Sequence, residues 1–254
     1  MTDIRRVGVM NDVHGPYHCP RTTNLVLDIF EDLGLDVALN GDIFDFANIS
    51  RHKKKSPLIQ TSLEDELYWG NNFFADIRKR FVAKGKRVQF MRGNHEEWLD
   101  TYLNEKAPAF WNLCQLDKMV DMEGVEITPY NMAVKVDKTN LYIQHSPPSY
   151  AATGPMTSLV KKVDASHIWG CTHRMGHAAI TGGSGNVYHG WFNGWLGSTT
   201  LSEEHFNVFK YMKGHSNWQH CFAIVTVING KEFYVTQHEI KNFSTVVDGF
   251  IYEG

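Results

Sequence analysis

The chain has 254 residues, 43% of them hydrophobic and 13% aromatic, which is enough for a sizeable core in one domain of residues 1–254. A formal net charge of -3 gives no global basic field for nucleic acid, and no apolar run approaches the roughly 20 residues of a membrane span. The four cysteines form no C-x-x-C pair, and the N-terminal segment lacks the apolar stretch of a signal peptide, so we expect a cytoplasmic protein without disulfides.

The first forty residues predict a β-α-β unit. Residues 7–10 form a short apolar run that is typical of a buried strand. Residues 20–33 predict a helix, because Pro20 suits a first turn, apolar residues recur at i+4, and Gly34 stands where a C′ glycine belongs. Residues 36–40 predict the second strand, and this order favours parallel pairing with a right-handed crossover.

A long helix and a third strand follow. Thr61 and Glu64 can form a capping box, and the helix that they begin closes near Gly85. Residues 87–91 predict the third strand and residues 96–104 another helix, whereas residues 107–123 stay ambiguous.

The second half of the chain predicts mostly strands. They span 125–130, 132–136, 141–144 and 167–169, with a late hairpin of 222–228 and 232–238 around the type I′ dipeptide Asn229-Gly230. Two such halves predict an α/β (α+β) fold, a four-layer αββα sandwich in which two mixed β-sheets pack face to face with outer helices.

Polar clusters follow the first two strands. Asp12 and His14 are two residues apart, and in an extended segment such side chains point the same way, toward one ion. Asp42 and Asp45 share the Gly41 turn, and the two oxygens of a carboxylate can bridge two ions. The alternatives are an ordinary turn for the first pair and a solvated Asx turn for the second.

Three more clusters follow later strands. Asn94 offers a weak, neutral amide ligand and leaves His95 free to act as an acid, although Asn94 also suits a helix N-cap. His145 ends a strand, where hydrogen bonds are the commoner partners of a histidine. Cys171 and His173 are again two residues apart, and the alternative for Cys171 is a small buried hydrophobe.

The series of five clusters is more informative than any one of them. Each follows an apolar run, and parallel strands bring their carboxyl ends to one edge, where ligands generally bind. Two ions held by carboxylate, imidazole and amide groups can clamp a phosphate ester and supply a hydroxide.

These residues resemble the calcineurin-like metallophosphoesterase superfamily over residues 5–175. Its motifs are D-x-H, G-D-x-x-D, G-N-H-E/D, a later H and G-H-x-H. Residues 193–198 look like the family's late strand-turn, and residues 41–46 followed by Ser50-Arg51-His52 resemble phage and bacterial members. The matching positions here are Asp12-Val13-His14, Gly41 to Asp45, Gly93 to Glu96, His145 and Gly170 to His173.

The resemblance implies two divalent ions (Mn, Fe or Zn) joined by Asp42 and a bridging hydroxide. It also implies that His95 protonates the leaving group, that Asp45 orients His95, and that Arg51, His52 or Arg174 attracts the anionic substrate. One ion would take Asp12, His14, Asp42 and His173, and the other Asp42, Asn94, His145 and Cys171.

Two positions depart from the family pattern. Cys171 stands where the family has His, and a thiolate would favour Zn or Fe over Mn, unless Cys171 does not bind metal at all. Phe46 stands where protein phosphatases of the superfamily carry a phosphate-clamping Arg, which disfavours that branch.

The sequence therefore predicts a two-metal phosphoesterase acting on mono- or diesters, with the oligomeric state left open. One rival is a metal-dependent DNA nuclease of the same superfamily, using basic residues 51–55 and the aromatics Trp191, Trp195, Tyr211 and Trp218. The net charge makes nucleic acid the less favoured substrate. The other rival is a non-catalytic scaffold, ranked low because His95 and most ligands are intact.

Overall fold

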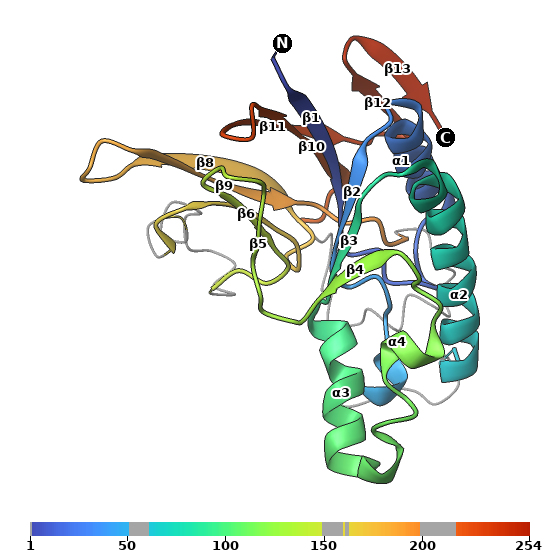
Figure 1. Cartoon of the computed structure of the whole chain (residues 1–254). Coiled ribbons are helices and arrows are strands. Elements are labelled where there is room, and N and C mark those ends of the chain that lie inside the picture. Colours follow the sequence, from blue (N-terminus) through green and yellow to red (C-terminus); the bar gives the residue numbers. More distant parts are fainter. Residues whose placement is uncertain (1, 51–60, 149–159, 161–162, 199–216) are drawn as a thin grey trace.

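The structure is a computed structural model, and it describes residues 2–50, 61–148, 160, 163–198 and 217–254 (Figure 1). Two large mixed β-sheets pack face to face, and helices lie against the first of them. The predicted fold class is therefore confirmed.

The first sheet has six strands in the order β11-β10-β1-β2-β3-β4. Strands β1 to β4 pair in parallel, whereas β10 pairs antiparallel with both β1 and β11. The carboxyl ends of β1, β2 and β3 consequently lie at one edge of the sheet. The bounds are β1 (Ile4–Met10), β2 (Asp36–Asn40), β3 (Val88–Met91), β4 (Val125–Thr128), β10 (Cys221–Ile228) and β11 (Glu232–Glu239).

The second sheet has five strands in the order β5-β6-β7-β9-β8. Strands β6, β7 and β9 are parallel, with antiparallel edge strands on either side. The bounds are β5 (Val134–Lys135), β6 (Leu141–Gln144), β7 (Ser166–Trp169), β8 (Met175–Thr181) and β9 (Val187–Asn193).

The alternation of side chains along each strand builds the layers. Val7 and Val9 of β1 face the second sheet, in one apolar cluster with Ile143 and Ile168. Met10 lies on the opposite face of β1 and packs in a larger apolar cluster with helices α1 (Pro20–Asp32) and α2 (Leu63–Arg80). Figure 1 shows both helices alongside the first sheet.

The outer face of the second sheet has its own small apolar cluster. Trp169 and Tyr188 pack there against the helical residues Val160 and Val163. Most of the segment that would supply the fourth, outer helical layer lies outside the described residues.

Helix ends follow the expected chemistry, with one correction. Gly34 adopts φ 59° directly after the C-cap of α1, as predicted. The capping box of α2 uses Ser62 and Asp65, one residue later than predicted: the Ser62 Oγ accepts from the Asp65 N–H at 3.0 Å, and the Asp65 carboxylate accepts from the Ser62 N–H at 3.2 Å. The pairs Thr61/Glu64 and Ser62/Asp65 each combine a hydroxyl with a carboxylate three residues later, so the sequence alone could not separate the two registers.

Helix α3 (Asn94–Lys106) starts at the carboxyl end of β3. Its N-cap is Gly93, so the alternative of Asn94 as N-cap is wrong. The Asn94 side chain is directed instead toward His145 and Cys171. Among the described helices, none has the length and apolar character needed to cross a membrane.

The late hairpin forms as predicted. Strands β10 and β11 are joined at Asn229 and Gly230, which both have positive φ (51° and 67°), as a type I′ turn requires. The remaining elements are short: η1 (Ala47–Ile49), η3 (Val82–Lys84), η4 (Pro108–Phe110), α4 (Leu116–Met119), β12 (Ser244–Val247) and β13 (Phe250–Glu253).

Candidate metal centre

Five loops from two sheets converge at one edge of the sandwich. The loops after β1, β2 and β3 supply Asp12 and His14, Asp42 and Asp45, and Asn94 and His95. The loops after β6 and β7 supply His145, Cys171 and His173. The structure thus brings these strand-end residues together, with both sheets contributing.

The backbone at these positions is left-handed, not extended. The φ angles are 52° at Asp12, 54° at His14, 49° at Asp42, 64° at Cys171 and 58° at His173. The i, i+2 side chains therefore converge because of a tight loop, and the prediction of an extended segment is wrong. The loops after β1 and β2 support one another, since Asp12 N–H donates to the Gly41 carbonyl at 3.0 Å and His14 N–H to the Asp42 carbonyl at 2.9 Å.

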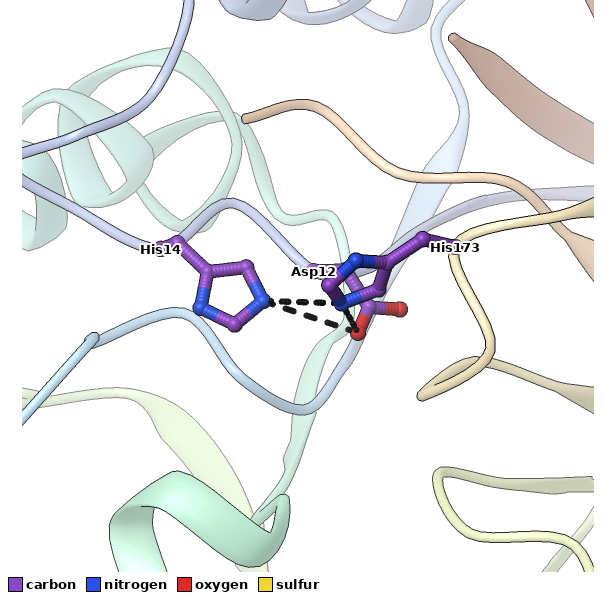
Figure 2. Close-up of side chains that lie close together, drawn as sticks. All are labelled: Asp12, His14 and His173. Carbon is purple, nitrogen blue, oxygen red and sulfur yellow. Dashed lines mark hydrogen bonds and ion pairs between the residues drawn. The ribbon is translucent and has the colours of Figure 1, made fainter. Parts of the chain in front are cut away.

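One cluster of ligand atoms comprises Asp12, His14 and His173 (Figure 2). His14 Nε2 and His173 Nε2 are 3.1 Å apart. Asp12 Oδ1 lies 3.2 Å from His173 Nε2 and 3.8 Å from His14 Nε2. All three residues are buried, with exposed fractions of 6% or less.

A second cluster comprises Asp42, His145 and Cys171, with Asn94 beside them. His145 Nε2 lies 3.1 Å from Asp42 Oδ2 and 3.2 Å from Asn94 Oδ1. The Cys171 thiol donates to the same Asn94 oxygen at 3.1 Å. The predicted second ligand set, including Cys171, is thus brought together.

The two clusters are linked through Asp42. Ligand atoms of His14, Asp42 and His95 also lie within 4.8 Å of one another. Asp42 Oδ1 accepts the His95 backbone N–H at 2.9 Å, which leaves Oδ2 toward His145. Asp42 is therefore the carboxylate that the second cluster shares with the group of His14 and His95.

Two glycines make room for the carboxylates. A Cβ on Gly93 would lie 2.2 Å from Asp42 Oδ1 and 2.4 Å from its backbone nitrogen. A Cβ on Gly170 would lie 2.7 Å from Asp12 Oδ2 and 3.0 Å from the His145 ring. The glycines of these motifs are thus needed for close approach to the ligands.

His95 lies beside the clusters and is held from two sides. Its Nδ1 is 2.5 Å from the Asp45 backbone oxygen and 3.7 Å from the Asp45 carboxylate. That carboxylate is closer to His14 Nδ1, at 3.0 Å. The Trp98 ring packs on the His95 ring at a centroid distance of 3.8 Å.

A set of supporting polar residues was not assigned from the sequence. The Glu96 carboxylate accepts three backbone N–H groups, from Asp42 (3.0 Å), Phe44 (2.9 Å) and Gly93 (2.7 Å), and so ties two ligand loops together. Asn11 donates to Asp12 Oδ2 at 2.5 Å. The G-N-H-E motif contained Glu96, but a carboxylate that serves only backbone groups has no distinguishing pattern in sequence.

Asn193, in the late strand-turn, holds the loop after β1 from the other sheet. It donates to the side-chain oxygen of Asn11 at 2.8 Å and to the Val9 carbonyl at 3.1 Å. The amide of Asn11 in turn donates to the Gly194 carbonyl at 2.8 Å. Both asparagines are fully buried, so this reciprocal network fixes the position of Asp12.

The electrostatics of the first cluster favour a positive charge among the carboxylates. Burial would raise the pKa of the Asp12 carboxyl, but the charges of His173 and His145 hold that pKa well below its usual range. Burial lowers the pKa of His14, but its interactions with the Asp12 and Asp45 carboxylates outweigh this and bring the pKa to about 10. A proton is held strongly there, as a metal cation would be.

The second cluster behaves in the same way. Burial opposes the charge of Asp42, yet the His145 and His95 rings lower the pKa of that carboxyl. Burial lowers the pKa of His145, but Asp42 and Asp12 raise it well above its usual value. Burial raises the pKa of the Cys171 thiol, so its deprotonation would need a cation nearby.

The donor set fits divalent metal ions. Two imidazole nitrogens that face each other at 3.1 Å repel unless a proton or a cation lies with them. Carboxylate, imidazole, amide and thiol groups are ligands of Zn, Fe and Mn. The family model of calcineurin-like phosphoesterases matches residues 5–193.

The chain belongs to the calcineurin-like phosphoesterase family. This confirms the resemblance drawn from the motifs. Among curated proteins, no sequence matches this chain.

Several solved structures are similar to this calcineurin-like chain. Chaetomium thermophilum Vps29 is 9% identical with a TM-score of 0.46, covering 98% of this chain and 95% of its own. YfcE, a phosphoesterase from E. coli, is 15% identical with a TM-score of 0.41, covering 97% and 96%. Haemophilus influenzae NAD nucleotidase (NadN) is 10% identical with a TM-score of 0.40, covering this whole chain (100%) and 60% of NadN.

Some predicted contacts with substrate are not at the centre. Arg51 and His52, as well as Lys53–Lys55 and Tyr211, lie outside the described residues. Trp191 and Trp195 are buried, with 6% and 1% exposed, because they pack into the interior. The prediction that these two tryptophans stack on a nucleic-acid strand is therefore wrong.

A cleft opens beside the second cluster. It has a volume of about 420 Å³ and reaches Asn94 at one end. Aromatic residues of α3 and the segment after β4 line it, together with acidic, polar and basic side chains: Asn48, Glu97, Trp98, Tyr102, Glu105, Lys106 and Tyr130.

Proposed function

We propose that this calcineurin-like protein is a two-metal phosphoesterase that hydrolyses phosphate mono- or diesters. The observation that supports it best is the pair of ligand clusters that are linked by the closeness of Asp42 to His14. We assign Asp12, His14, Asp42 and His173 to one ion, and Asp42, Asn94, His145 and Cys171 to the other. When bound, two such ions neutralise phosphate charge and make water nucleophilic near neutral pH.

In this proposal the chain positions one acid. A carbonyl oxygen only accepts hydrogen bonds, so His95 Nδ1 must donate to Asp45 O. Nε2 lies 3.8 Å from Asp42 Oδ2, at the ligand clusters. In the doubly protonated ring Nε2 also carries a proton, which it can give to a leaving oxygen, and the neutral ring left behind keeps its proton on Nδ1. A positioned acid of this kind contributes about 10²–10⁴ in rate.

The cleft beside Asn94 supports a small leaving group. Its aromatic residues suit a flat or apolar alcohol. Its lining also has two carboxylates, Glu97 and Glu105, against one ammonium group, Lys106, and this acidic excess disfavours a second phosphate. A polyanionic nucleic acid is therefore the weaker candidate substrate. We further propose a single domain over residues 1–254, supported by the pairing of C-terminal β10 with β1, and a cytoplasmic location, supported by four free cysteines.

The test begins with the metal content of the purified protein, with Mn, Fe and Zn measured separately. The same preparation is then assayed on p-nitrophenyl phosphate, bis-p-nitrophenyl phosphate and supercoiled DNA. We expect about two ions per chain and metal-dependent turnover of at least one small ester. Salt-dependent nicking of DNA without small-ester turnover would favour the nuclease, and full metal content without any hydrolysis would favour the non-catalytic scaffold.

Two variants locate the chemistry. His95→Gln should lower turnover by about 10²-fold or more, because the acid is lost. His177→Gln is the matched control and should keep wild-type turnover, because His177 is exposed on β8 and belongs to neither ligand cluster. Equal rates in both variants would remove His95 from the mechanism.

A further inference from the structure

A buried carboxyl group on α2 lies outside the two ligand clusters. Glu66 sits in the first turn of the helix and is 0% exposed. Its Oε2 accepts the backbone N–H of Phe46 at 2.7 Å, and Oε1 has no hydrogen-bond partner among the described residues. Glutamate is almost never fully buried unless paired, so the Phe46 N–H is the group that this side chain serves.

The peptide group held by Glu66 is also the one that holds His95. The Phe46 N–H and the Asp45 carbonyl belong to a single peptide unit. Glu66 contacts its N–H end, and His95 Nδ1 contacts its oxygen at 2.5 Å. A continuous line therefore runs from helix α2, through one peptide, to the imidazole.

This peptide needs outside support. Phe46 has φ 44°, a left-handed conformation that is costly for a bulky residue. Its ring is fully buried and stacks on Phe44 at 5.0 Å, so the N–H cannot turn to water. If the Glu66 acceptor were removed, the peptide could rotate toward another partner and carry the Asp45 oxygen away from His95.

Hydrogen bonds in such a line also strengthen one another. A bond donated by the N–H end of a peptide polarises the peptide and makes its carbonyl oxygen a better acceptor. The Glu66 contact should thus favour the His95 tautomer that carries its proton on Nδ1.

We propose that Glu66 is a positioning residue, which acts through the Asp45–Phe46 peptide to fix the tautomer and orientation of His95. This inference rests on the proposed function, because the orientation matters for turnover only if Nε2 protonates a leaving oxygen. Glu66 itself touches neither substrate nor the ligand clusters.

The role needs a hydrogen-bond acceptor, not a charge. Burial, together with the charge of Asp45, raises the pKa of Glu66 to about 9, so the group is neutral near pH 7. Glu66→Gln therefore keeps both the charge state and a carbonyl acceptor. Glu66→Leu keeps the approximate volume and removes the acceptor.

The kinetic test uses metal-loaded protein and two monoesters, p-nitrophenyl phosphate and phenyl phosphate. Phenolate is the poorer leaving group and depends more on protonation. For Glu66→Leu we expect kcat on phenyl phosphate to fall at least about tenfold, with KM within about twofold, and kcat on the nitrophenyl ester to fall less than about threefold. Glu66→Gln should stay within about threefold of wild type on both esters.

A control on the same helix separates positioning from folding. Ile77 is fully buried on α2, and Ile77→Ala leaves a cavity well along the helix from the Asp45–Phe46 peptide. We expect it to lower stability and to leave the ratio of the two ester rates unchanged. Equal losses on both esters in Glu66→Leu, or a Glu66→Gln variant as impaired as Glu66→Leu, would overturn the inference.

A second measurement does not depend on turnover. In ¹⁵N–¹H spectra of the histidine side chains, the His95 signal is assigned by its loss in His95→Gln. We expect a protonated Nδ1 in wild type and Glu66→Gln, and a mixed tautomer in Glu66→Leu. An unchanged His95 signal in Glu66→Leu refutes the Glu66 role, whereas the expected change without any ester hydrolysis supports it and counts against the proposed function alone.

Discussion

Glu96 offers the sharpest test of how the ligand loops are held. Its carboxylate accepts the N–H groups of Asp42 and Gly93 on Oε2 and that of Phe44 on Oε1. A buried donor without a partner costs about 1–3 kcal/mol, so removal of all three acceptors in Glu96→Ala would cost about 3–9 kcal/mol. Because whole domains are stable by only about 5–15 kcal/mol, that variant should be largely unfolded.

Glu96→Gln is the variant that gives a measurable number. An amide keeps one oxygen, which can still accept from Asp42 and Gly93, but it places an NH₂ group against the Phe44 N–H. One lost bond predicts a cost of about 1–3 kcal/mol. Urea unfolding of the metal-free protein should show this as a lower midpoint with an unchanged slope.

The neighbouring Glu97 is the matched control. It is partly exposed on the same helix, and Glu97→Gln should change stability by less than about 0.5 kcal/mol. If Glu96→Gln costs no more than this control, the carboxylate does not hold the loops and the reasoning fails.

Three further outcomes follow from the same centre. Gly93→Ala should weaken metal binding more than about tenfold in calorimetry, because the new Cβ would collide with Asp42. The control Gly183→Ala places its Cβ where no atom lies within 4 Å, and it should bind metal as the wild type does. Because Glu66 has a folded-state pKa of about 9, above its ordinary value, its stabilising contribution is present at acid pH and is lost as pH rises toward 9. Chemical unfolding from pH 5 to 9 should therefore show a steeper fall for wild type than for Glu66→Gln, and parallel curves would contradict the buried neutral form. Cys171→His should shift bound metal from Zn toward Mn by elemental analysis, and unchanged content would mean that Cys171 does not bind metal.

The strand ends were predictable because apolar runs and polar clusters alternate so regularly in the first half of the chain. Parallel strands must bring their carboxyl ends to one edge. Asp12, Asp42 and Asn94 follow those ends, and Asp42 and Asn94 both lie beside His145. The contribution of the second sheet was not predicted: His145 and Cys171 follow strands of their own, but nothing in their local pattern shows that these strands belong to another sheet.

Other features were hidden for physical reasons. The left-handed loop at Asp12 and His14 depends on backbone bonds to a segment some thirty residues away, which local pattern does not reveal. The predicted capping box of α2 was one residue too early, because adjacent positions carry similar hydroxyl and carboxylate side chains. The nuclease alternative placed Trp191 on a binding surface, yet this residue packs between the two sheets.

The left-handed loops have a consequence for how such a site can change. Five of the seven proposed ligands occupy backbone conformations that most side chains avoid, each at a cost on the order of 1–3 kcal/mol. Glycine relieves that cost and alanine does not. A chain that no longer needed the metal site would therefore become more stable if glycine replaced the ligands at these positions. Keeping aspartate and histidine there lowers the folding stability and retains the metal-binding groups.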